Sequence, residues 1–173
     1  MKKKSKPVLL AISGVKNSGK TTLIERILPK LKEAGYKAAT VKHDGHDFEV
    51  DVEGTDTYKH RKAGVYGTAI FSKNKFMVIK EQKDTKEEEL ISYFSEADII
   101  ILEGFKYSDY PKIEIVRKGN SEKSVCKKET ILALATDIEN FDSSINIVDL
   151  NDRDSIVNLI IEFIKGRDNE GHF

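Results

Sequence analysis

The chain has 173 residues, and its 29 Lys and Arg are balanced by 29 Asp and Glu, a balance that argues against a dedicated nucleic-acid-binding protein. Its single cysteine, Cys126, excludes an internal disulfide and a cysteine-based metal cluster. No apolar run approaches the roughly 18 residues that a membrane span needs, and no secretory signal is visible, so we expect a cytoplasmic protein without membrane contact. A basic tail over residues 1–7 should precede one domain over residues 8–173.

Hydrophobic periodicity, glycine stops and capping residues predict alternating strands and helices along this domain. The helix in the middle of the chain should start at Thr55 or Asp56 and stop at Gly64. In chain order we expect strand 8–13, helix 20–34, strand 36–43, a short helix up to residue 63, strands 66–72 and 75–80, helix 86–96, strands 98–103, 112–117, 131–135 and 145–148, and helix 154–165.

The order of these elements predicts the fold class. Only Lys73 and Asn74 separate strands 66–72 and 75–80, a spacing typical of an antiparallel hairpin. Residues 98–103 form an almost continuous apolar run, as in a parallel strand that is covered on both faces. We therefore expect an α/β fold of the P-loop NTPase kind: a doubly wound, mainly parallel sheet flanked by helices, with an antiparallel hairpin.

The most informative motif lies between the first strand and the first helix. Residues 14–21, Gly-Val-Lys-Asn-Ser-Gly-Lys-Thr, match the pattern G-x-x-x-x-G-K-[ST] in the strand–loop–helix context that a phosphate-binding loop requires. Glycine at both ends allows the backbone N–H groups to surround a phosphate, Lys20 should reach the β- and γ-phosphates, and Thr21 should hold Mg²⁺. The expected nucleotide-binding residues are Gly14, Lys16, Asn17, Ser18, Gly19, Lys20, Thr21 and Thr22.

A second carboxylate should orient the metal, and strand geometry selects it. Asp98 and Glu103 bracket one strand, whose five residues span about 16 Å. Nucleotides bind at the carboxyl ends of parallel strands, so Glu103 is the predicted Mg²⁺-side acid and Asp98 a solvated strand start. Gly104 should let the backbone turn sharply next to the ligand.

The second strand also ends at this edge, in the polar stretch Lys42-His43-Asp44-Gly45-His46-Asp47. Two His and two Asp in this stretch could form a transition-metal site, but a polar loop near the phosphates is the favoured interpretation. Asp44 is then a second candidate for Mg²⁺, and Lys42 and His43 are candidate phosphate or partner contacts. Arg61, on the following helix, is either a switch-like cation or an ordinary helix residue.

The sequence says little about which base the bound nucleotide carries. A guanine site usually presents a carboxylate at the end of a late strand, and Asp137 follows the apolar run 131–135. The Asn-Lys-x-Asp motif is absent, and a plain turn acid explains Asp137 equally well.

Together these segments resemble the MobB family of molybdopterin-guanine dinucleotide biosynthesis adapter proteins. Beyond the generic phosphate loop, the resemblance rests on three specific stretches in the same order and spacing. They are the Lys-His-x-x-His run at residues 42–46, the Asp-Thr…His-Arg-x-Ala-Gly run at residues 56–64, and Glu-Gly-Phe-Lys at residues 103–106 with Pro-Lys-Ile-Glu at residues 111–114.

The resemblance implies a GTP-binding protein with weak intrinsic hydrolysis, usually a homodimer, that assists a MobA-type guanylyltransferase in attaching GMP to molybdopterin. In that reading GTP and Mg²⁺ bind at Lys20 and Thr21, with Glu103 and Asp44 on the metal side. In the same reading molybdopterin is a further candidate partner. The residues around the phosphates, or around a cleft that faces the partner, would be Lys42, His43, His46, Arg61 and Lys106. The candidates for the hydrolytic step are Asp44, Arg61 and His43, and we expect slow turnover because no motif assigns them.

Other classes of protein that carry a phosphate-binding loop fit this sequence less well. A small-molecule kinase usually needs an arginine-bearing lid, and the arginines here are few and scattered. A nickel-delivery GTPase usually carries a Cys/His metal motif, which Cys126 does not supply. A ParA-like ATPase normally has a lysine directly after the first loop glycine, where this chain has Val15.

Overall fold

The computed structural model describes residues 6–45, 48–141 and 144–170, with side chains described up to residue 167. The chain divides into two compact units. Residues up to 43 and from 87 onward form the larger unit, and residues 44–86 form the smaller unit. The expectation of one domain over residues 8–173 concerns whether the two units fold together, and it stays a prediction.

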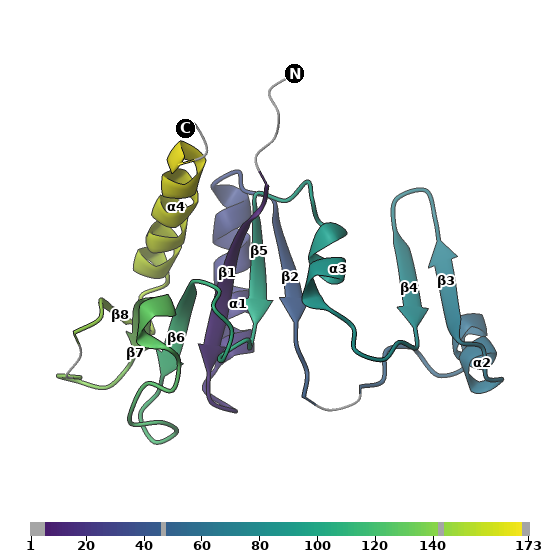
Figure 1. Cartoon of the computed structure of the whole chain (residues 1–173), viewed down its shortest axis with the longest axis horizontal. Helices are drawn as coiled ribbons and strands as arrows, with labels where there is room; N and C mark the ends of the chain where they lie inside the picture. The colour runs from purple at the N-terminus through teal and green to yellow at the C-terminus, as the bar shows by residue number, and fades with distance from the viewer. Residues whose placement is uncertain (1–5, 46–47, 142–143, 171–173) are drawn as a thin grey trace. The chain divides into compact units, whose positions relative to one another are not determined.

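The larger unit is built on a six-stranded sheet in which every recorded strand pair is parallel. The strand order is β2-β5-β1-β6-β7-β8, with β1 in the interior of the sheet. The strands are β1 (Val8–Gly14), β2 (Ala38–Lys42), β5 (Ile99–Glu103), β6 (Lys112–Val116), β7 (Ile131–Thr136) and β8 (Ile147–Asp149). The arrows of β1, β2 and β5 point to the lower edge of the sheet in Figure 1, where their carboxyl ends lie together. The expected α/β fold is thereby confirmed.

Helices cover both faces of this sheet, which explains the apolar run in β5. Ile99 and Ile101 pack in a core with residues of α1 (Lys20–Glu33) and α4 (Arg153–Glu170). Ile100 and Leu102 face the other way, in a smaller core beside Ile91 of α3 (Glu87–Ser92). Side chains alternate between the two faces of a strand, so a strand buried on both faces carries apolar residues throughout.

Several element boundaries differ from the expected ones, and α4 continues to Glu170, beyond the expected end at residue 165. The helix predicted over residues 86–96 ends at Ser92, because the next residues form i→i+3 turns: Tyr93, Phe94 and Ala97 donate to carbonyls three positions earlier. The last strand is Ile147–Asp149 rather than 145–148. Within the described ranges, no helix is both long and apolar enough to cross a lipid bilayer.

The smaller unit contains α2 (Asp56–Lys62) and the hairpin of β3 (Gly67–Phe71) and β4 (Phe76–Lys80). Thr55 caps α2, its Oγ1 accepting a hydrogen bond of 3.3 Å from the Tyr58 N–H. The hairpin pairs in antiparallel register, with Phe71 opposite Phe76. It forms a two-stranded sheet of its own, outside the six-stranded sheet.

Candidate nucleotide-binding site

The loop between β1 and α1 has the backbone conformation of a phosphate-binding loop. Gly14 ends β1 with φ of 143°, and Gly19 precedes α1 with φ of 99°. Between them Asn17 is left-handed, with φ of 61°. Such residues let neighbouring N–H groups converge on an anion, and the start of α1 adds the positive end of its dipole. A Cβ on Gly14 would lie 2.7 Å from the Ile115 carbonyl oxygen, so the neighbouring strand leaves room for glycine alone.

Ser18 in this loop has no exposed surface. Its Oγ is one of two buried side-chain polar atoms in the described part of the chain that have no hydrogen-bond partner. A buried hydroxyl left in this state costs about 1–3 kcal/mol. A donor without an acceptor, inside a loop of converging N–H groups, fits a loop that holds an anion.

The Lys20 ammonium group folds back over the loop. Its Nζ donates to the Val15 carbonyl oxygen at 2.7 Å and to that of Gly14 at 3.4 Å. Burial lowers the pKa of Lys20, the Glu103 carboxylate opposes this shift, and the charges of Lys106 and Lys42 lower the pKa further. The structure thus brings the predicted cations Lys42 and Lys106 within electrostatic reach of Lys20. Three lysines at one sheet edge form a site suited to a polyphosphate.

Thr21 and Glu103 meet as the strand argument predicts. The Thr21 Oγ1 donates to Glu103 Oε1 at 2.6 Å, from the first turn of α1 to the last residue of β5. Glu103 shares the strand face of Ile99 and Ile101, which pack against α1, so its side chain leaves the sheet on the helix side. A hydroxyl and a carboxylate in contact beside a phosphate loop are oxygen ligands of the kind that Mg²⁺ takes.

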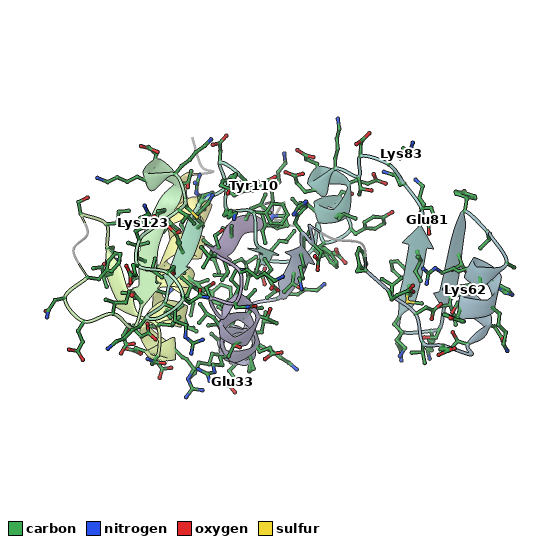
Figure 2. The ribbon with its side chains drawn as sticks, turned by 90° about the horizontal axis from the view of Figure 1, so that it is seen from below. Glu33, Lys62, Glu81, Lys83, Tyr110 and Lys123 are labelled. Carbon is green, nitrogen blue, oxygen red and sulfur yellow. The ribbon has the colours of Figure 1, made fainter. Side chains whose placement is uncertain are left out.

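The end of β2 lies next to the end of β5. Lys42 pairs in register with Glu103, and the His43 N–H donates to the Glu103 carbonyl oxygen at 3.2 Å. The His43 ring meets the Phe105 ring edge to face, with centroids 5.8 Å apart. Figure 2 views the molecule from the carboxyl edge of the sheet, with Tyr110 labelled in the segment that follows Phe105. Lys42 and His43 therefore belong to the same edge as the phosphate loop.

Asp44 and Arg61 lie in the smaller unit. Desolvation raises the pKa of Asp51 there, but hydrogen bonds from Thr57, Thr55 and the Val52 N–H lower it overall, and the positive charge of Arg61 adds a smaller lowering. The roles of Asp44 and Arg61 toward the phosphate loop stay predictions. His46 and Asp47 lie outside the described residues. No group of three or more His, Cys, Asp and Glu within the described ranges could hold a metal ion. The transition-metal interpretation of residues 43–47 is thus tested only in part.

Asp137 follows β7 at the same sheet edge and is held by the segment that follows β6. Its Oδ1 accepts from the Lys118 N–H at 2.7 Å, and its Oδ2 lies 3.8 Å from Arg117 Nε. The Asp137 carboxylate is thus held by a hydrogen bond and an ion pair to that segment. Its role toward a base stays a prediction.

A family model agrees with the geometry of this site. The model described as "Molybdopterin guanine dinucleotide synthesis protein B", or MobB, matches residues 9–137, which include the phosphate loop, Glu103 and Asp137. The chain belongs to the MobB family. The molybdopterin-guanine dinucleotide biosynthesis adapter protein of Escherichia coli strain K12 is 32% identical over 167 residues, which cover 91% of this chain and 93% of the relative. The adapter protein of Haemophilus influenzae is 31% identical over 131 residues, 74% of each chain.

Solved MobB structures support the same assignment. The crystal structure of Bacillus subtilis MobB has a TM-score of 0.70 and 29% sequence identity, and the match covers 90% of this chain and 96% of that one. A crystal structure of molybdopterin-guanine biosynthesis protein B has a TM-score of 0.68 and 28% identity, covering 91% and 99% of the two chains. The family resemblance read from the sequence is therefore confirmed.

The site of this MobB-family chain contains two residues that the motif search missed. The Arg117 Nη1 lies 3.1 Å from the position that a Cβ on Gly19 would take. The Asn120 side-chain amide donates to the Lys16 carbonyl oxygen at 3.1 Å. Both residues follow β6, so the rule that sites form at the carboxyl ends of strands could have indicated them.

Proposed function

We propose that this protein is a GTP-binding adapter in the formation of molybdopterin guanine dinucleotide. The observation that carries the proposal is its similarity to the Escherichia coli adapter protein over nearly the whole of both chains, phosphate loop included. A GTP-loaded adapter would assist a MobA-type guanylyltransferase that attaches GMP to molybdopterin. The protein itself would hydrolyse GTP only weakly.

GTP would be held by its phosphates. The N–H groups and side chains of the loop surround them, Lys20 neutralises their charge, and Lys42 and Lys106 add positive charge at the rim. The unpartnered Ser18 Oγ supports this assignment, because a phosphate oxygen supplies the missing acceptor. The proposed loop contacts are Gly14, Lys16, Asn17, Ser18, Gly19, Lys20, Thr21 and Thr22.

Mg²⁺ would be held by Thr21 and Glu103, with Asp44 as a third candidate ligand. The hydrogen bond between Thr21 and Glu103 supports the first two, since both oxygens already lie together beside the loop. The metal would neutralise the β- and γ-phosphates. Asp44 and Arg61 would act on the attacking water and the γ-phosphate, and His43 and His46 would line the cleft toward the partner.

Asp137 would recognise guanine by accepting hydrogen bonds from its N1–H and N2–H groups. The proposal is supported by the position of Asp137 after β7, where the Lys118 N–H and Arg117 orient its carboxylate. An Asp137→Asn variant should lose the preference for GTP over ATP while keeping its phosphate contacts. A GTP preference that survives this change would reject Asp137 as the base-reading residue.

We also propose that the protein is a homodimer that works in the cytoplasm, where GTP is available. Apolar side chains of the hairpin support the dimer, because several are largely exposed: Phe71 at 84%, Phe76 at 68% and Val78 at 55%. A two-stranded sheet is only marginally stable by itself. A second copy of the chain would cover these side chains.

The experiment is a competition titration of GTP against ATP, repeated with the guanylyltransferase and molybdopterin present. A preference for GTP together with faster dinucleotide formation is the expected result. A preference for ATP with a phosphorylated small-molecule product would instead indicate a kinase. Hydrolysis above about 1 s⁻¹ by the isolated protein would count against an adapter role.

A further inference from the structure

The connection from β5 to β6 is unusual for a parallel sheet. These strands lie on either side of β1, and residues 104–111 join them without a helix. Parallel crossovers commonly need a dozen or more residues and use a helix, which satisfies its own backbone groups. This crossover packs against the small core beside β1 through Phe105 and Tyr110. Its carbonyl groups therefore need partners from elsewhere.

Lys112, the first residue of β6, donates hydrogen bonds to two of these carbonyl groups. Its side chain is fully buried, on the strand face opposite Ile113 and Ile115, which pack toward α1 and α4. Its Nζ donates to the Ser108 carbonyl oxygen at 2.6 Å and to that of Phe105 at 3.4 Å. A buried ammonium group is costly unless such acceptors surround it, and burial lowers the pKa of Lys112. Neither the phosphate loop nor the metal side accounts for a lysine at this position.

The carbonyls that Lys112 holds flank residues of the site. Lys106 lies between Phe105 and Ser108, and Glu103 immediately precedes Gly104. The turn is conformationally demanding, since Phe105 has φ of 47° and Gly104 has φ of 102°. A left-handed non-glycine residue costs about 1–2 kcal/mol, so it persists only where its surroundings hold it. The Ser13 Oγ adds a second tie by donating to the Gly104 carbonyl oxygen at 2.5 Å.

Glu114, two residues further along β6, has the same burial but a different task. Its side chain is 1% exposed and accepts hydrogen bonds from Ser124 Oγ, Val125 N and Cys126 N. It therefore ties the strand to residues 124–126, a segment without predicted site residues. Lys112 and Glu114 are thus two buried charged residues of the same strand, and of these two only Lys112 donates to the crossover.

We propose that Lys112 is a positioning residue for the metal side of the nucleotide site. By holding the Phe105 and Ser108 carbonyls, it fixes the crossover so that Glu103 and Lys106 face the phosphate loop. The proposal rests on the proposed GTP and Mg²⁺ site and deepens it. The consequence is specific. Loss of Lys112 should reduce the gain in GTP affinity that Mg²⁺ provides more than it reduces the GTP affinity measured without Mg²⁺.

The experiment compares GTP dissociation constants in Mg²⁺ and in EDTA for the wild type, Lys112→Met and the control Glu114→Gln. We expect the Mg²⁺-dependent gain in affinity to fall by about tenfold or more in Lys112→Met, as for residues that orient metal ligands, with a smaller fall in the EDTA affinity through Lys106. Glu114→Gln should keep the wild-type gain even if its thermal stability falls. Lys112→Gln, with a shorter polar side chain, replaces the Met variant if that one does not fold.

Three results would overturn the proposal: a wild-type gain in the folded Lys112 variant, an equal loss in Glu114→Gln, or failure of both Lys112 variants to fold. The last result would make Lys112 a purely structural residue. A wild-type protein whose GTP affinity ignores Mg²⁺ would refute the proposed metal site itself. Failure of the proposed function is therefore distinguishable from failure of this inference.

Discussion

Thr21 donates a 2.6 Å hydrogen bond to Glu103, which lies 82 positions later in the sequence. The contact joins the first turn of α1, which follows β1, to the last residue of β5. The parallel register of β1 and β5 brings these two ends to one edge of the sheet. In this contact the hydroxyl proton neutralises part of the carboxylate charge. A metal ion that takes both oxygens as ligands would replace that proton-mediated contact.

Glu103→Gln should therefore separate the metal from the nucleotide. The neutral amide is a weaker Mg²⁺ ligand, so we expect the Mg²⁺-dependent gain in GTP affinity to fall by about tenfold or more. Without Mg²⁺ the carboxylate repels the phosphates, so the variant should bind GTP in EDTA at least as tightly as the wild type. Calorimetric titration in both buffers measures the two effects.

Asp98→Asn is the matched control, since it makes the same chemical change at the residue before the same strand. Asp98 accepts a hydrogen bond from the Lys37 N–H at the opposite edge of the sheet. Its variant should keep the wild-type difference between the two buffers. A loss of equal size in Asp98→Asn would mean that Glu103 acts only through the fold.

Lys20→Ala should abolish most nucleotide binding with or without Mg²⁺. Charged hydrogen bonds to phosphate oxygens are worth ~1.5–3 kcal/mol each, so two of them predict a loss of at least about 100-fold in affinity. Lys30→Ala serves as control on the same helix, because Lys30 pairs with Asp154 at 2.6 Å and a partly exposed pair contributes little. Unchanged GTP affinity in Lys20→Ala would reject the site.

The sequence predicts the part of this candidate site that depends on local pattern. A strand, a glycine loop and a helix follow one another directly, and the end of an apolar strand marks Glu103. Arg117 was missed because its approach to Gly19 depends on which strand lies beside β1, and strand order is a tertiary property. The buried charges of Lys112 and Glu114 were likewise unpredictable, since composition alone treats Lys and Glu as surface residues.

Gly14→Ala should destabilise the protein far more than Gly35→Ala. Both glycines have positive φ, 143° and 88°, so either substitution meets backbone strain of about 1–2 kcal/mol. A Cβ on Gly14 also meets the Ile115 carbonyl oxygen at 2.7 Å and Ser18 Oγ at 2.8 Å, whereas nothing lies within 4 Å at Gly35. We expect a loss of roughly 2–4 kcal/mol against ~1 kcal/mol in urea unfolding. Equal losses would show that the contact with β6 is not tight.

Phe71→Asp should convert the proposed dimer to a monomer. Phe71 is 84% exposed and lies opposite Phe76, so a charge there would be buried without a partner in any interface that covers the hairpin. Light scattering should give half the wild-type mass. Tyr93→Asp, at an exposed aromatic residue of the larger unit, should leave the mass unchanged. A dimeric Phe71→Asp protein would exclude the hairpin as the interface.

The Cys126 thiol should be almost unreactive in the folded protein. Burial and the neighbouring Glu114 carboxylate raise its pKa to about 12, from 9.0. The thiolate is the reactive form, so at pH 8 its fraction is ~10⁻⁴ instead of ~10⁻¹, and alkylation should be about a thousandfold slower than in the unfolded chain. The rate in the native protein should rise about tenfold per pH unit, since each unit raises the thiolate fraction tenfold.

The same shift links Cys126 to stability. The unfolded chain loses the thiol proton more readily than the folded chain, so this contribution to the free energy of unfolding is complete below pH 9 and is lost as the pH rises toward about 12.

Glu114→Gln removes the negative charge next to Cys126, which should lower the pKa of the thiol and speed its alkylation by iodoacetamide in the native protein. Mass spectrometry measures the rate. A native rate equal to the unfolded rate at pH 8 would contradict the buried, carboxylate-facing position of Cys126.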